Sequence, residues 1–95
     1  MYRLVFSMQA KSDWDYWKQS GNTAIMRKIA ALLEDMTAHP YTGIGKPEQL
    51  KYGLSGCWSR RINREHRIIY RVKETEIEVE VMTVRICIPT RYGNG

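Results

Sequence analysis

The chain has 95 residues, 43% of them hydrophobic, a length that suits one domain and excludes two independent ones. The apolar fraction and the three tryptophans exclude a disordered chain. Fifteen Lys and Arg against ten Asp and Glu give a formal net charge of +5, which favours a polyanionic partner.

The N-terminal segment predicts a short strand followed by a helix. Residues 2–6 form an apolar run that ends at Ser7. This run is far shorter than a membrane span or a secretion signal, so we expect a soluble cytoplasmic protein with no membrane contact. The Ser7 hydroxyl can cap a helix in which Ala10 and Trp17 share one face, and Gly21 is a typical helix end.

A second helix is predicted from about Asn22 until His39-Pro40 ends it. Its apolar residues recur at helical spacing and form one stripe: Ile25, Ile29, Leu32, Leu33 and Met36. Residues 40–56 contain four of the seven glycines, and we predict a loop there.

Three strands are predicted after this loop, at residues 57–63, 66–72 and 76 to about 85. The last one alternates three glutamates with three branched aliphatic residues, the period of an antiparallel strand with one buried face. The order of elements predicts an α+β domain, with two helices packed on one face of a curved, antiparallel sheet of about four strands. The other face would carry arginines such as Arg67 and Arg71.

The whole net charge lies in one stretch of the sequence. Between Lys46 and Arg71 there are seven basic and two acidic residues, whereas the remainder carries eight of each sign. This patch predicts binding to nucleic acid or to an acidic protein, and the alternative is a basic surface that only faces solvent. Two cysteines, Cys57 and Cys87, fit a reducing compartment better than a disulfide scaffold.

Three segments in and around this patch are distinctive: residues 43–51 read GIGKPEQLK, residues 54–62 read LSGCWSRRI and residues 65–67 read EHR. Together they resemble the YoeB/Txe group of toxins in the RelE superfamily, and the likeness covers residues 2 to about 85. The resemblance implies a RelE-like fold, similar to that of microbial ribonucleases. It also implies a toxin that cuts messenger RNA in the ribosomal decoding site by acid–base chemistry, without metal or cofactor. The partners implied are a Phd/YefM-type antitoxin, the ribosome with its mRNA, and a second copy in a homodimer.

The resemblance gives chemical roles to six side chains. Glu48 matches the general base of the family, and Arg67 matches the arginine that stabilises the phosphate in the transition state. The positions that grip ribosomal or messenger RNA match Lys46, Lys51, Arg60 and Arg61. Without the family, Glu48 would be read as an exposed loop acid. Regular strand alternation would turn Arg60 and Arg61 to opposite faces, so at most one of them need face RNA.

The end of the chain departs from the family pattern. Members typically finish with His-Tyr, whose histidine is the proposed general acid, whereas this sequence has no histidine after His66. We therefore divide the chain into a toxin domain at residues 1–85 and an atypical tail at residues 86–95. Tyr92 is a candidate substitute acid. We expect His66 to be structural and the His39 imidazole to meet free carbonyl groups at the helix end.

Two other functions fit parts of the pattern. The missing histidine favours a non-catalytic protein that keeps the fold and the basic patch and binds its antitoxin or the ribosome. A ParE-like inhibitor of DNA gyrase would share the superfamily fold, although the Lys-Pro-Glu and Trp-Ser-Arg-Arg segments argue against it. Mapping of mRNA cuts in cells would separate the three.

Overall fold

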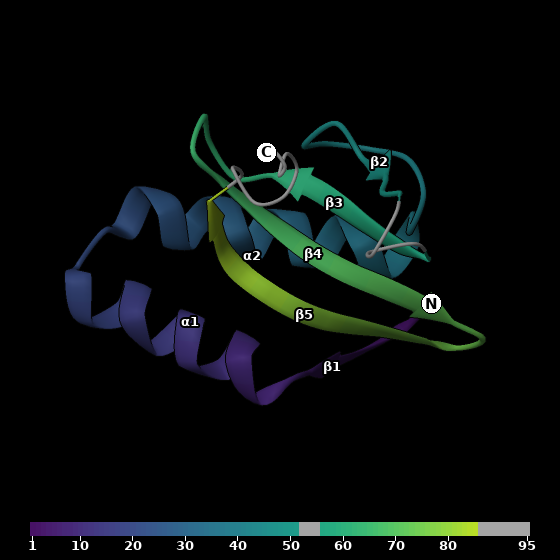
Figure 1. The fold of residues 1–95 in the computed structure, drawn as a ribbon, viewed down its shortest axis with the longest axis horizontal. Helices are drawn as coiled ribbons and strands as arrows, with labels where there is room; N and C mark the ends of the chain where they lie inside the picture. The colour runs from purple at the N-terminus through teal and green to yellow at the C-terminus, as the bar shows by residue number, and fades with distance from the viewer. Residues whose placement is uncertain (52–55, 86–95) are drawn as a thin grey trace.

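A computed structural model describes residues 1–51 and 56–85 of the chain. The elements follow one another as β1 (Arg3–Phe6), α1 (Met8–Ser20), α2 (Thr23–Ala38), β2 (Glu48–Gln49), β3 (Cys57–Arg61), β4 (His66–Lys73) and β5 (Glu76–Arg85). Figure 1 shows a strongly curved sheet with both helices on one side of it. Neither helix in this part of the chain is long and apolar enough to cross a membrane.

The two helices begin and end at the predicted residues. The Ser7 hydroxyl oxygen accepts a hydrogen bond from the Ala10 amide at 2.9 Å and so caps α1. Gly21 ends this helix in the left-handed conformation, with φ of 72°, which glycine adopts without steric cost. The Asn22 side chain then caps α2 by accepting from the Ile25 amide at 3.2 Å.

The sheet has five strands in the order β1-β5-β4-β3-β2. The α+β class and the two helices on one face are confirmed, but the predicted sheet of about four antiparallel strands is corrected in two respects. The first strand, β1, pairs parallel to β5, and β2 adds a two-residue strand antiparallel to β3. Neither feature leaves a local signal, because parallel partners lie far apart in sequence and two residues show no alternation.

The hydrophobic core lies between the helices and the sheet. The predicted stripe on α2 is confirmed, since Ile29, Leu32 and Met36 are fully buried. In β5, Ile77 and Val79 are buried while the glutamates between them are half-buried, as the alternation predicts. The core cluster consists of Ala10, Trp17, Ile29, Leu32, Met36, Ile62, Ile68, Tyr70, Ile77 and Val79.

Candidate active site

The face of the sheet away from the helices brings Glu48 and Arg67 together. Strand register places Glu48 opposite Ser59 and Arg61 opposite Arg67, so side chains of β2, β3 and β4 share this face. The Glu48 Oε1 atom lies 3.3 Å from Arg67 Nη1, and the two groups form an ion pair. The Glu48 side chain is 63% exposed and that of Arg67 is 23% exposed, so a ligand can reach both.

The loop that delivers Glu48 is fixed to β3 on both sides of β2. Before β2, the Arg61 amide donates a hydrogen bond to the Gly45 carbonyl at 2.7 Å. After it, the Leu50 amide donates to the Cys57 carbonyl at 2.9 Å. Lys46 has a positive φ of 51°, an uncommon conformation for a residue with a side chain. The segment that leads from the turn at residues 44–45 into β2 is therefore held in a defined conformation.

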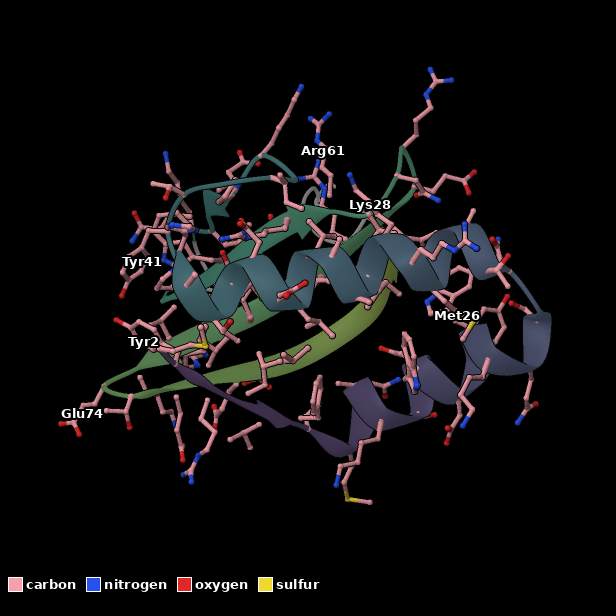
Figure 2. All side chains as sticks on the ribbon, turned by 180° about the vertical axis from the view of Figure 1, so that it is seen from behind. Tyr2, Met26, Lys28, Tyr41, Arg61 and Glu74 are labelled. Atoms are coloured by element: carbon pink, nitrogen blue, oxygen red, sulfur yellow. The ribbon has the colours of Figure 1, made fainter. Side chains whose placement is uncertain are left out.

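Three of the predicted RNA-binding residues are close to this pair in the sequence or the strand register: Lys46 and Lys51 flank Glu48 in the chain, and Arg61 lies opposite Arg67. Lys46, Lys51 and Arg61 are all exposed. Figure 2 shows Arg61 projecting from the margin of the molecule. Long cationic side chains beside an accessible carboxylate form a surface that can bind phosphates while a base acts on the ribose.

Arg60 is the exception among the predicted RNA contacts. Its side chain has no exposed surface, and it lies on the helix side of the sheet, where it forms an ion pair with Asp35 at 2.6 Å. The predicted contact of Arg60 with RNA is therefore wrong, because RNA cannot reach a guanidinium enclosed by protein. Strand alternation, which separates the faces of Arg60 and Arg61, was the signal for this difference.

The two histidines have positions unlike that of a catalytic group. The His66 ring packs edge-on against Trp17 of α1, with ring centroids 5.0 Å apart, and its side chain is 13% exposed, as the structural prediction requires. Among residues 1–51 and 56–85, the His39 imidazole meets no carbonyl group, so that prediction is corrected. Its Nδ1 lies 3.5 Å from Asp35 Oδ1, since α2 places the two residues one turn apart.

Ser59 is a further residue of this face, and no sequence motif indicated a role for it. This residue lies opposite Glu48 in the strand register and is fully buried. Among the described residues its hydroxyl has no hydrogen-bond partner, which is uncommon for a buried polar atom. In the sequence, strand alternation places Ser59 on the same face as Cys57 and Arg61, and this alternation is the only indication of its position.

Burial shifts the pKa of two further titratable groups of the sheet. Burial raises the pKa of the Cys57 thiol, so the nucleophilic thiolate is disfavoured at neutral pH. Burial and the neighbouring Glu78 raise the pKa of Glu80. Residues 1–51 and 56–85 contain no group of three or more His, Cys, Asp or Glu side chains able to hold a metal ion. Tyr92 lies outside the described residues.

A groove lies on the helix side of the molecule. It is an open groove of about 520 Å³ between the two helices and β1, lined by Phe6, Ala10, Lys11, Trp14, Asp15, Ala30 and Leu33. Apart from Lys11 and Asp15, the groove presents apolar side chains. These two charged side chains both belong to α1, whereas the pair on the open face of the sheet joins two strands.

Comparisons with known proteins identify the family of this chain. A family model for the YoeB-like toxin of bacterial type II toxin-antitoxin systems matches residues 6–86. Toxin YoeB of Escherichia coli strain K12 is 41% identical over 75 residues, which cover 79% of this chain and 88% of that protein.

Two solved structures from Staphylococcus aureus share the fold. In a heterotetrameric YoeB–YefM toxin–antitoxin complex, the matching chain superposes with a TM-score of 0.80 at 37% identity, covering 90% of this chain and 98% of that one. A YoeB dimer gives a TM-score of 0.80 at 38% identity, covering 88% and 97%. The chain therefore belongs to the YoeB family of toxins of bacterial type II toxin–antitoxin systems.

Proposed function

We propose that this toxin is an endoribonuclease that enters the decoding site of the cytoplasmic ribosome and cuts messenger RNA there. The observation that carries the proposal is the pairing of Glu48 with Arg67 at 3.3 Å on an accessible sheet face surrounded by exposed cations. A carboxylate and a guanidinium at this separation supply a proton acceptor and a phosphate ligand to the same nucleotide.

In the proposed reaction, Glu48 accepts the proton of a ribose 2′-hydroxyl. The 2′-oxygen then attacks the neighbouring phosphorus, the bond from phosphorus to the 5′-oxygen breaks, and a 2′,3′-cyclic phosphate forms. Arg67 stabilises the negative charge that develops on the phosphate oxygens. The leaving 5′-oxygen needs a proton. No histidine follows His66, and the candidate substitute, the Tyr92 phenol, is a much weaker acid than an imidazolium, so we propose that this step is slow.

Lys46, Lys51 and Arg61 are proposed to hold the ribosomal and messenger RNA around the pair. Their exposure supports this role, because phosphate contacts position an RNA strand without depending on its sequence. Arg60 has no part in this grip.

The proposed protein partners follow from the relatives. One of them is solved as a complex with YefM, and another as a dimer. We propose a YefM-type antitoxin that inhibits this chain, and self-association into a homodimer. An antitoxin segment with acidic residues would gain attraction from the basic stretch between Lys46 and Arg71.

A second candidate function rests on one observation, the missing histidine. In that case the protein keeps the fold and the basic surface, binds the ribosome or its antitoxin, and does not cut RNA. In the first candidate function Glu48 is needed for RNA cleavage, whereas in the second it contributes to binding at most.

The test is expression of the toxin in cells, followed by primer extension on abundant messages. The proposal expects new ends at ribosome-occupied codons, which disappear with Glu48→Gln and persist with Glu74→Gln, a substitution of an exposed carboxylate in the turn before β5. The same absence of cuts in the parent and both variants, with ribosome binding retained, would support the non-catalytic alternative.

A further inference from the structure

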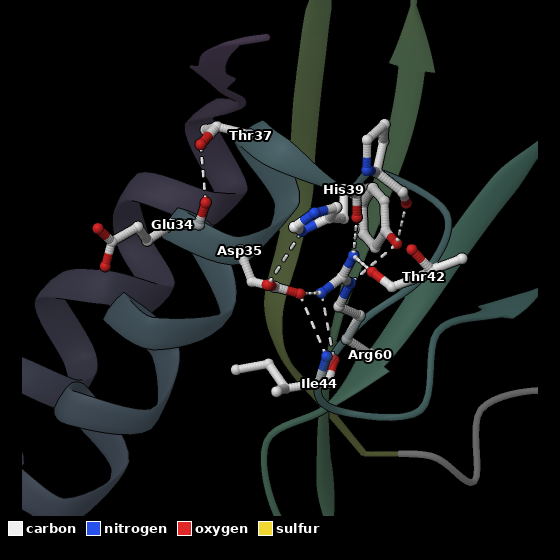
Figure 3. A network of polar contacts seen from close by, with 9 residues as sticks. Glu34, Asp35, Thr37, His39, Thr42, Ile44 and Arg60 are labelled. Carbon is white, nitrogen blue, oxygen red and sulfur yellow. Dashed lines mark hydrogen bonds and ion pairs between the residues drawn. The ribbon is translucent and has the colours of Figure 1, made fainter. Parts of the chain in front are cut away.

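The buried Arg60 is bonded to the loop that leads to the candidate active site. Figure 3 shows its guanidinium surrounded by acceptors from α2 and from that loop. Nη1 donates to Asp35 Oδ2 at 2.6 Å and to the Ile44 carbonyl at 3.2 Å. Nη2 donates to the Thr42 carbonyl at 2.7 Å and to the His39 carbonyl. Three backbone carbonyls between α2 and β2 thus converge on one side chain.

Tyr70 completes this network from the neighbouring strand. Its hydroxyl accepts from Arg60 Nε at 3.1 Å and donates to the Pro40 carbonyl at 2.8 Å. Burial raises the pKa of Tyr70, so the hydroxyl keeps the proton that it donates. Asp35 adds one more bond to the loop, because it accepts from the Ile44 amide at 3.2 Å.

The bonding of Arg60 is saturated. A guanidinium has five N–H groups, and the five bonds to Asp35, Tyr70 and the three carbonyls use one each. A buried cation is tolerated only when its donors are satisfied and its charge is paired. Lysine, with three donors, could not replace it, and an apolar side chain would leave the carbonyls without partners. The network therefore specifies a loop conformation as well as filling space.

This loop conformation sets the position of Glu48. Three residues lie between Ile44, which Arg60 and Asp35 hold, and Glu48. Between them the Gly45 carbonyl accepts from the Arg61 amide, directly after Arg60 in β3. Arg60 thus fixes the loop from the helix side of the sheet while its neighbour fixes it from the strand edge.

We propose that Arg60 is a positioning residue for the RNA-cleaving site: through Asp35 and Tyr70 it holds the loop of residues 39–46 so that Glu48 lies against Arg67. The catalytic meaning of this inference rests on the proposed function, whereas the structural coupling between the two sides of the sheet can be measured without it. Replacement of Arg60 itself would not distinguish a loss of positioning from unfolding of the protein. Milder changes at its partners are therefore preferable.

Two substitutions loosen the network without removing its charges. Tyr70→Phe deletes the hydroxyl between Arg60 and Pro40 and keeps the ring. Gly43→Ala acts from the surface, because a Cβ atom on Gly43 would lie 1.9 Å from Asp35 Oδ2 and the residue has φ of 115°. Gly21→Ala is the matched control, since it also places alanine at a positive φ, of 72°, but meets no atom within 4 Å.

The experiment combines NMR of the full chain with single-turnover cleavage on programmed ribosomes. In Tyr70→Phe and Gly43→Ala we expect exchange of the Arg61 amide to rise about tenfold or more, with shifted Glu48 and Arg67 side-chain resonances. We expect kcat to fall about tenfold or more at unchanged KM, because misplacement of a reacting group acts on the chemical step. Gly21→Ala should lower the unfolding temperature without either effect.

The outcomes separate this inference from the proposed function. Unchanged Glu48 and Arg67 resonances in both variants would overturn the inference whether or not the toxin cuts RNA. Shifted resonances with an unchanged kcat would overturn the positioning role. If the resonances shift in the variants but the parent chain does not cut RNA, the result would support the structural coupling and reject the nuclease function. If one variant fails to fold, the other decides.

Discussion

Arg60 and Arg61 are adjacent in the sequence and have opposite surroundings in the structure. Arg61 is exposed on the face that carries Glu48 and Arg67, whereas Arg60 is buried on the helix side and paired with Asp35. The family motif contains both arginines as neighbours. Successive side chains of a strand point to opposite faces of the sheet, so the two arginines lie on different sides. At the residue scale, position on the strand decides whether an arginine lies on the open face, where we propose that RNA binds, or bonds to the protein's own loop.

For the exposed cations, we expect Arg61→Ala and Lys51→Ala each to weaken binding to ribosomes and to lower the slope of log K against log salt by about 1. The unfolding temperature should hardly change, because exposed charges contribute little to stability. Filter binding at several salt concentrations measures the slope, with Lys18→Ala at the end of α1 as the control. Equal affinities in all variants would mean that this surface does not contact the ribosome.

For the buried pair, the effect should depend on pH. The hydrogen bond from Arg60 lowers the pKa of Asp35 below its usual value of 3.8. A carboxyl with a lowered folded-state pKa stabilises the fold above its unfolded pKa, and this contribution is lost as pH falls through the folded pKa.

We therefore expect Asp35→Asn to lower the free energy of unfolding at pH 7 by roughly 1.5–3 kcal/mol, the range for hydrogen bonds to charged groups. The difference from the parent should shrink as pH falls below about 4, the unfolded pKa of an aspartate. Urea unfolding at several pH values measures it, with Asp15→Asn on the exposed side of α1 for comparison. A difference that stays constant down to the lowest accessible pH would contradict the account.

At the scale of elements, the helices and the long strands could be predicted because their signals are local. Caps at Ser7 and Asn22, the apolar stripe of α2 and the alternation of β5 each lie within one element. The parallel pairing of β1 with β5 and the short β2 depend on tertiary contacts, so the sequence alone could not predict them. The same holds for the candidate site: Glu48 and Arg67 were predicted through a resemblance, whereas their ion pair needs the register of three strands.

The burial of β3 gives a prediction of its own at this scale. In a Cys87→Ser background, we expect Cys57 to react with a thiol reagent at pH 8 more slowly than free cysteine, since burial raises the pKa of its thiol and so lowers the thiolate fraction. Denaturant should abolish the difference. A native-state rate equal to that of free cysteine would show that β3 opens readily and that the sheet face is less well packed than its burial indicates.

At the scale of the whole molecule, the sheet separates two surfaces with different chemistry. One carries the Glu48–Arg67 pair with exposed cations, and the other is covered by α1 and α2 and holds the Arg60 network (Figure 1). In the function that we propose, the open face supplies a base and a phosphate ligand for RNA cleavage. The usual histidine acid of the family is absent from the sequence, so the account expects a toxin that binds the ribosome and cuts slowly.

The most direct test of this account is the single-turnover rate of mRNA cleavage on programmed ribosomes, before and after the family ending is restored. The variant replaces residues 86–95 with Gly-His-Tyr after Arg85. We expect cleavage to accelerate roughly a hundredfold or more, the contribution of a positioned general acid, and the gain to vanish when Glu48→Gln is added. Equal rates with the two endings, or a gain that survives Glu48→Gln, would contradict the assignment of Glu48 and Arg67 as the catalytic pair that lacks its acid.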